Sequence, residues 1–161
     1  MAGGYRFVPV TRADLPLLER WLSGAHMSPW WGDPAEEIAL IEEEIGIGPT
    51  DMRIVHHGET PFAFVQDWDA TTGPQFGSVP PGSRAVDTFL GEPSWLGKGH
   101  APRYLRARAL ELLVAGAPEV VIDPDPENAR AISAYRRAGF HGEAIRTDGE
   151  GYDVLVMTFS P

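Results

Sequence analysis

An amide and a phenol stand seven residues apart in the C-terminal part of the chain, at Asn128 and Tyr135. This spacing is about two helical turns, so both side chains project from one face of the helix expected there. An apolar run at 120–122 leads to Asp123 in a proline-rich loop, and Gly139 supplies a helix end. The helix face therefore offers an amide and a proton-bearing phenol along an apolar stripe. An ordinary amphipathic helix with Tyr135 half in the core fits the same pattern.

A glycine-containing loop at 96–101 precedes a second expected helix at 102–113. Glycines at a loop-to-helix junction let the backbone close around an anion, and the free N–H groups of the first turn attract it. A pyrophosphate fits such a loop, although simple turn glycines would give the same pattern. A nucleotide-binding P-loop is excluded, because five residues separate Gly91 from Gly97 where four are needed, and Gly99 stands where Ser or Thr should bind magnesium.

In this order, the two segments resemble the acetyl-CoA-binding half of the Gcn5-related N-acetyltransferase (GNAT) family. The resemblance implies that Tyr135 protonates the departing CoA thiolate, a role that suits a tyrosine with an ordinary pKa of about 10. It also places Leu96 where the family carries Arg or Gln, so backbone donors would bind CoA, with Lys98 as a candidate charge partner. A backbone N–H near Thr88 or Phe89 would hold the acetyl oxygen. The implied acetyl-CoA-binding residues are Thr88, Phe89, Leu90, Leu96, Gly97, Lys98, Gly99, His100, Ala101 and Asn128.

Within the GNAT family the chain resembles the aminoglycoside 6′-N-acetyltransferases most. The similarity implies that Asp87 and Asp123 hold a polyamine sugar, and either is a candidate base that acts directly or through water, or only orients the amine. Aromatic and amide side chains would contact the same sugar, although each tryptophan also fits a core position. The segment at 69–83 departs from the relatives, because it is shorter and has Phe76 where Trp is common. The implied amine-binding residues are Trp30, Trp31, Gln66, Trp68, Asp87 and Asp123.

Three functions compete at this point. The first is acetylation of the 6′-amine of aminoglycosides, and the second is acylation of a siderophore precursor or another small amine by a neighbouring branch. Those neighbours carry a histidine near the Asp87 segment, and 84–90 contains none. The third is a non-catalytic acyl-CoA-binding domain that kept the fold.

Composition limits the kinds of catalysis and the classes of ligand that fit this chain. The 161 residues include no cysteine, so thiol catalysis and disulfides are excluded, and acetyl transfer is expected to be direct, in a ternary complex. A net charge of −10 disfavours nucleic acid and favours a cationic amine, although such a surface also simply aids solubility. No metal site is expected, because the histidines have no metal-binding spacing. They are expected at the surface or in turns, at His26, His56, His57, His100 and His141.

The elements that would position these residues suit one globular domain spanning 1–161. No apolar run is long enough to cross a membrane and residues 1–6 lack a signal-peptide core, so a cytoplasmic monomer or homodimer is expected. The periodicity predicts an α/β chain with a mixed sheet, and the resemblance implies the GNAT fold, mostly antiparallel and flanked by helices. Strands are expected at 5–10, 52–57, 62–68, 84–90, 120–122, 144–147 and 152–159, and helices at 15–22, 33–45, 102–113 and 128–138.

Overall fold

A computed structural model describes residues 4–161, so residues 1–3 of the opening segment lie outside it. Every predicted helix and strand is present, in the predicted order. No helix within 4–161 is long and apolar enough to cross a membrane. The bounds are β1 (Tyr5–Pro9), α1 (Leu15–Leu22), α2 (Pro34–Glu44), β2 (Asp51–His57), β3 (Thr60–Asp69), β4 (Arg84–Leu90), α3 (His100–Val114), β5 (Val120–Ile122), α4 (Ala129–Ala138), β6 (Phe140–Thr147) and β7 (Asp153–Phe159).

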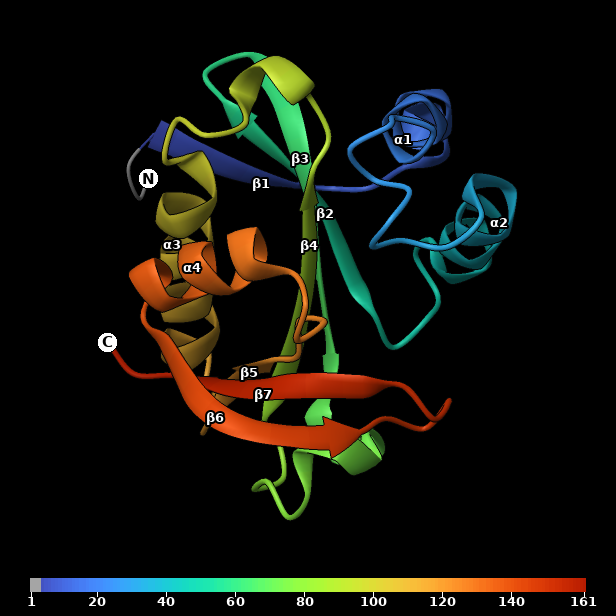
Figure 1. Ribbon diagram of the computed structural model, residues 1–161. Helices are drawn as coiled ribbons and strands as arrows, with labels where there is room; N and C mark the ends of the chain where they lie inside the picture. The colour runs from blue at the N-terminus through green and yellow to red at the C-terminus, as the bar shows by residue number, and fades with distance from the viewer. Residues whose placement is uncertain (1–3) are drawn as a thin grey trace.

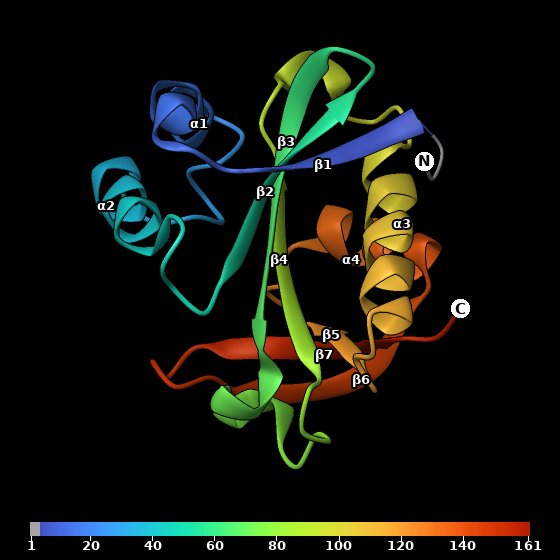
Figure 2. The ribbon, with the colours of Figure 1, turned by 180° about the vertical axis from the view of Figure 1, so that it is seen from behind.

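The strands form one seven-stranded sheet in the order β1-β2-β3-β4-β5-β7-β6. Neighbouring strands run antiparallel except β4 and β5, which are parallel. Helices α1 and α2 lie on one side of the sheet, and α3 and α4 on the other (Figures 1 and 2). This is the mixed, mostly antiparallel GNAT arrangement predicted from the sequence.

The parallel pair β4–β5 is short, and its end creates an opening in the sheet. Pairing covers Arg84 to Val86 of β4 and stops there. Arg84 N donates to Glu119 O at 3.0 Å, just before β5. Backbone N–H groups point to alternate edges of a strand, so those of Thr88 and Leu90 face the same edge beyond the end of β5. Figure 1 shows β4 continuing upward, away from β5 and β7.

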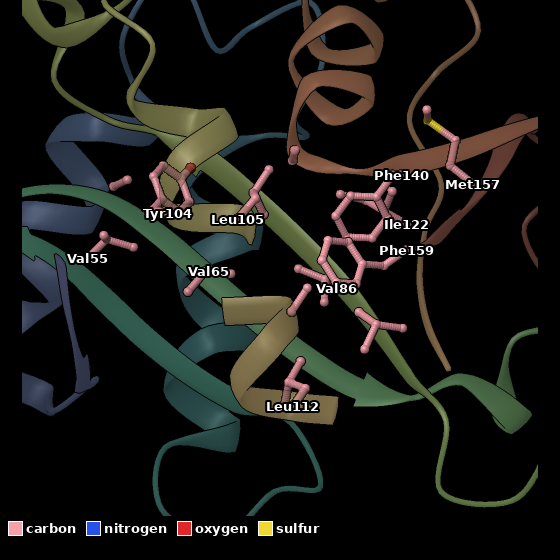
Figure 3. Close-up of a cluster of buried hydrophobic side chains, with 14 of the residues drawn as sticks. Val55, Val65, Val86, Tyr104, Leu105, Leu112, Ile122, Phe140, Met157 and Phe159 are labelled. Carbon is pink, nitrogen blue, oxygen red and sulfur yellow. The ribbon is translucent and has the colours of Figure 1, made fainter. Parts of the chain in front are cut away.

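Two large hydrophobic cores hold the helices to the sheet, and a smaller cluster that includes Phe76 packs the 69–83 segment against it. The larger lies between the sheet and α3 and α4, where Tyr104, Leu105 and Phe140 are buried (Figure 3). The second packs α1 and α2 against the opposite face through Leu18, Trp21 and others. Side chains of successive strand residues point to opposite faces, so the strands supply both cores.

Local signals in the sequence define the helix ends. Asp33 caps α2 by accepting a hydrogen bond from Glu36 N at 3.2 Å, and Asn128 caps α4 in the same way, from Ala131 N at 3.2 Å. Gly139 ends α4 with a φ of 117°, a left-handed conformation that suits glycine. Asn128 is therefore the N-cap residue of the helix that carries Tyr135.

One expected strand needs correction, and one loop is more ordered than its length indicates. The strand expected at 144–147 is twice as long in the structure, because β6 starts directly after Gly139 and pairs with β7 across a bulge. The loop at 69–83 contains two short 3-10 helices, Ala70–Thr72 and Pro74–Phe76, and buries Phe76 against the ring of Trp68. This segment is packed against the sheet, so it holds its side chains in defined places.

A buried ion network anchors the middle of α3 to the sheet. Asp67 on β3 accepts from Arg84 at 2.8 Å and from Arg108 of α3 at 3.1 Å. Asp67 and Arg108 are both buried, so the charge of each is stabilised by its ion-pair partners and not by water. The network fixes the position of α3, whose first turn follows the glycine loop.

We expect Gly91→Ala to lower the free energy of unfolding by about 1–3 kcal/mol or more, as overpacking does. Gly91 follows β4, and a Cβ there would lie 2.1 Å from the indole of Trp21, which docks α1. Urea unfolding measures the effect. Gly149→Ala is the matched control, because its Cβ would meet only ordinary contacts at 3.7 Å, and equal losses in both variants would contradict this account of α1 docking.

Candidate active site

A cavity of about 540 Å³ runs along the open edge of β4, between the loop joining α1 to α2 and the helices α3 and α4. Its walls carry most of the residues expected to bind acetyl-CoA. These are Thr88, Phe89, Leu90, Leu96, Gly97, Gly99, His100, Ala101 and Asn128, together with Tyr135.

The glycine loop forms one end of this cavity. Gly97 and Gly99 have φ values of 73° and 80°, so both occupy the left-handed region that glycine adopts without strain. The first turn of α3 begins immediately afterwards, at His100, and its free N–H groups give the loop an anion-binding character. The prediction that this loop precedes a helix is therefore confirmed, with the helix starting two residues earlier than expected.

The cation beside this loop differs from the one suggested by the sequence. Lys98 is exposed and does not line the cavity. Arg130, in the first turn of α4, does line it, and its guanidinium lies 3.3 Å from the position a Cβ on Gly97 would take. The guanidinium of Arg103 likewise lies 3.7 Å from the position that a Cβ on Gly99 would take. Arg130 could not be found from loop spacing, because it comes from a different helix.

The open edge of β4 lines the middle of the cavity. The register gives the edge-facing N–H to Thr88 and Leu90, and turns that of Phe89 toward β3. Leu90 O is occupied, because His26 Nε2 donates to it at 2.9 Å. This bond ties the α1–α2 loop, which carries Trp30 and Trp31, to the end of β4. Trp31 also packs edge-on against Phe89, with ring centroids 4.9 Å apart.

Tyr135 lies in the cavity wall near a second buried phenol. The hydroxyl of Thr88 contacts Phe64 O at 2.7 Å and the hydroxyl of Tyr104 at 2.6 Å. Since a carbonyl only accepts, Thr88 donates its one proton to Phe64 O, and Tyr104 must donate to Thr88. Burial, then Tyr104 and the nearby carboxylates, raise the pKa of Tyr135. The expectation of an ordinary pKa was therefore wrong, and the phenol is held even more firmly in its protonated form.

A second cavity of about 150 Å³ adjoins the first and contains the two predicted aspartates. Asp87 on β4 and Asp123 after β5 line it, on either side of the point where the strands part. The residues common to both cavities mark where they meet: Trp30, Trp31, Thr88, Asn128, Ala131 and Tyr135. The site residues predicted from separate segments thus come together, with Tyr135 and Thr88 between the long cavity and the carboxylates.

Gln66 and Trp68 both donate hydrogen bonds to Asp87, and neither residue lines one of the two cavities. Gln66 Nε2 donates to Asp87 Oδ2 at 3.0 Å, and Trp68 Nε1 donates to the same oxygen at 2.9 Å. Burial raises the pKa of Asp87, and these two bonds counter part of the rise. These two residues orient the carboxylate and leave Oδ1 of Asp87 without these donors, and their contact with the amine stays a prediction.

Asp123 has a different environment. Gln75 Nε2, from the packed 69–83 segment, donates to Asp123 Oδ2 at 2.9 Å. Burial, followed by repulsion from Asp87, raises the pKa of Asp123 to about 7. A carboxylate with a pKa near the working pH suits general base catalysis. Gln75 gave no signal in the sequence, because only the fold brings it to Asp123.

More carboxylates lie around the small cavity than the sequence indicated. Burial raises the pKa of Glu37, and the charges of Asp87 and Glu150 add to the rise. Asp148, in the β6–β7 turn, likewise raises that of Asp123. Glu37 of α2 is half-buried against Gly32. Acidic side chains therefore approach from α2, β4, β5 and the β6–β7 turn.

The expectation that all histidines lie at the surface or in turns was wrong for His56 and His100, which are half-buried in β2 and α3, and His26 lies in a turn as expected. His26 and His100 are half-buried and line the large cavity. His100 Nδ1 lies 2.8 Å from the hydroxyl of Tyr5, and its ring packs against Trp95 with centroids 4.7 Å apart. Among residues 4–161, no group of three or more His, Asp or Glu side chains is arranged to hold a metal ion.

Comparison with known proteins agrees with this geometry. The family described as "Acetyltransferase (GNAT) domain" matches residues 10–147, most of the chain. The chain belongs to the GNAT acetyltransferase family. Members of this family transfer an acyl group from acyl-CoA, and this GNAT protein is accordingly an acetyl-CoA-dependent N-acetyltransferase.

The similar proteins include resistance enzymes. The GNAT chain is 31% identical over 162 residues to "Aminoglycoside N(6′)-acetyltransferase type 1" of Klebsiella pneumoniae, covering 92% of this chain and 79% of the relative. It is 40% identical over 80 residues to a kanamycin resistance protein of Rhizobium radiobacter, covering 48% of this chain and 72% of the relative. The resemblance to the aminoglycoside 6′-N-acetyltransferase branch, predicted from the sequence, is confirmed.

Solved structures of the same branch superimpose closely. The complex of AAC(6′)-Ib with ribostamycin and coenzyme A has a TM-score of 0.85 at 26% identity, covering 98% of this chain and 93% of that one. The complex of AAC(6′)-Ib with coenzyme A and kanamycin has a TM-score of 0.83 at 26% identity, covering 97% and 94%. The GNAT fold therefore extends over nearly all of both chains.

We expect Gly99→Ala to weaken acetyl-CoA binding about tenfold or more, the loss of roughly one charged hydrogen bond, by shifting the loop backbone. Gly116→Ala at the end of α3 is the matched control, because its φ of 112° is also left-handed and it lies away from the cavity. Both should lose about 1–2 kcal/mol of stability to backbone strain. Calorimetry with acetyl-CoA separates them, and equal affinity in both variants would contradict a phosphate-binding loop.

Proposed function

We propose that this GNAT protein acetylates the 6′-amine of an aminoglycoside by direct transfer from acetyl-CoA in a ternary complex. The observation that carries the proposal is the meeting of the two cavities at Tyr135 and Thr88, with Asp87 and Asp123 beyond them. An acyl donor in the long cavity and an amine in the small one would meet at that junction.

The long cavity fits the donor in three respects. Left-handed glycines and Arg130 at one end suit a pyrophosphate, and the unpaired edge of β4 suits the amide groups of a pantetheine arm. Thr88 N–H would hold the acetyl oxygen, since it faces the opening and Phe89 N–H does not. A fixed backbone donor there stabilises negative charge on the oxygen during attack.

The two aspartates take different roles in this proposal. Asp87 keeps one oxygen bound to Gln66 and Trp68, so it anchors the ammonium through the other. Asp123, with a pKa of about 7, takes the proton that the ammonium must lose before its lone pair can attack. Tyr135 then donates to the sulfur of the departing thiolate.

A polycationic substrate suits the surrounding charge. Glu37 of α2 lies near both Asp87 and Glu150, and Asp148, in the same β6–β7 turn as Glu150, lies near Asp123. A single amine needs one carboxylate, whereas an aminoglycoside offers several ammonium groups for them to bind. Trp30 is 43% exposed and lines both cavities, so its ring can lie against a sugar.

A substrate panel tests the proposal. Thiol release from acetyl-CoA is measured with kanamycin-type aminoglycosides, polyamines and siderophore precursors, and NMR of the product gives the acetylated position. Turnover with aminoglycosides at the 6′-amine is the expected result. Selective turnover of another small amine, or CoA binding without turnover of any amine, would reject it in favour of one of the two other functions considered from the sequence.

We expect Tyr135→Phe to lower kcat by roughly 10²–10⁴-fold, the range for a lost general acid, with little change in KM. The variant keeps the ring, so its melting temperature should stay near that of the parent protein. Tyr152→Phe, at an exposed phenol, is the control. An unchanged kcat in Tyr135→Phe, with chemistry shown to be rate-limiting, would remove the proton-donor role.

We expect Asp87→Asn and Asp123→Asn each to lower kcat/KM for aminoglycosides by at least about 100-fold, as loss of a base or a charged anchor does, with acetyl-CoA affinity nearly intact. Raised salt should increase KM of the parent protein, because it screens the attraction. Glu43→Gln removes the same charge from an exposed site on α2 and is the control.

Stability against pH gives a further check on Asp123. Its folded pKa of about 7 lies above the ordinary value, so the folded state binds this proton more tightly than the unfolded chain. The related stability is complete below about pH 4 and is lost as the pH rises to about 7. Asp123→Asn should therefore melt higher than the parent protein at pH 8 and equally at pH 4. A lower melting temperature at pH 8 would indicate a structural role.

A further inference from the structure

Gln75 is a buried polar residue for which the fold itself gives no reason. It sits in the 3-10 helix Pro74–Phe76 and is only 6% exposed. The segment around it is tightly packed, because a Cβ on Gly73 would lie 2.9 Å from the rings of Phe76 and Trp68. Its side chain is therefore held in place rather than free to choose among partners.

The amide of Gln75 is satisfied at one end only. Nε2 donates to Asp123 Oδ2 at 2.9 Å, whereas Oε1 is buried without a hydrogen-bond partner. An unpaired buried acceptor costs stability, and leucine, of similar size, would avoid that cost. The gain from a glutamine at this position must therefore come from its contact with Asp123.

The charges facing Asp123 all disfavour its ionised form. Asp87 approaches from β4 and Asp148 from the β6–β7 turn, and both raise the pKa of Asp123. Asp125 lines the same small cavity, and Tyr135 faces it from α4 as a neutral phenol. Gln75 provides a side-chain hydrogen bond to Asp123 that favours the ionised form and so opposes the effect of these groups.

We propose that Gln75 is a positioning residue for acetyl transfer, which holds Asp123 as an oriented carboxylate and leaves its second oxygen to accept the proton of the amine. This inference rests on the proposed function for the role of Asp123 as base. It does not depend on which amine is the substrate. It assigns the packed 69–83 segment a part in the chemistry, through one hydrogen bond.

The first experiment measures Asp123 directly and needs no amine. Carbon-13 NMR of labelled aspartate carboxyls, assigned with Asp123→Asn, follows the titration of Asp123 in the parent protein and in Gln75→Leu. We expect the midpoint to rise in Gln75→Leu, because the bond that favours the carboxylate is lost. The melting temperature at pH 5, where Asp123 is protonated, should be unchanged or higher. An unchanged midpoint would overturn the inference.

The second experiment measures the consequence for turnover. With the best substrate of the panel, the acid limb of the kcat/KM profile should move to higher pH in Gln75→Leu, and kcat/KM at pH 6 should fall about tenfold, the loss of one charge-assisted hydrogen bond. In the Asp123→Asn background, Gln75→Leu should have no further effect. Ser78→Ala, an exposed change in the same segment, is the control and should match the parent protein.

The outcomes separate the two proposals. A raised midpoint, a shifted acid limb and no added effect in the Asp123→Asn background support the positioning role. A loss of kcat/KM of equal size with and without Asp123, or a uniform loss at every pH, would overturn it. If aminoglycosides are not turned over, the NMR midpoint still supports or overturns the contact between Gln75 and Asp123, while the proposed substrate fails independently.

Discussion

The parting of β4 from β5 is the constraint on which the rest of the site depends. Three residues of β4 pair with β5, and beyond Val86 the edge of β4 has no neighbouring strand. Unpaired backbone groups inside a protein need partners, so an exposed strand edge enclosed by helices is prepared for a ligand with its own amides. The same parting sets Asp87 and Asp123 on either side of the gap, and α4 brings Tyr135 to it.

The acidic groups near the small cavity are a second constraint on the site, because the fold brings them close together and partly buries them. Loss of hydration disfavours the ionised forms of all three, and repulsion adds to this at Asp123 and Glu37, which is why the pKa values of Asp87, Asp123 and Glu37 are all raised. The positive charges of a bound polycation would offset both effects by attraction. These clustered carboxylates therefore carry an electrostatic cost that a cationic ligand would relieve and a neutral one would not.

Local patterns in the sequence predicted much of this arrangement. The spacing of Asn128 and Tyr135 and the glycines before α3 depend on one helix or turn, so they can be read along the chain. Contacts between distant segments could not be predicted from the sequence. His26 reaches Leu90 across 64 positions and Gln75 reaches Asp123 across 48, and neither residue type indicates such a partner. Gln66 and Trp68 were identified by resemblance, and in the structure both donate hydrogen bonds to Asp87 and neither lines a cavity wall.

The buried anchor of α3 has a consequence for how this enzyme can diversify. Asp67, Arg84 and Arg108 fasten α3 to strands β3 and β4 without using any residue of the α1–α2 loop, the 69–83 segment or the β6–β7 turn. Those three segments supply Trp30, Gln75 and Asp148. Substitutions in them can change the surroundings of Asp87 and Asp123 while α3 keeps its place on the sheet. The anchor of α3 and these three segments therefore lie on separate parts of the chain, so the surroundings of the carboxylates can change independently of the position of α3.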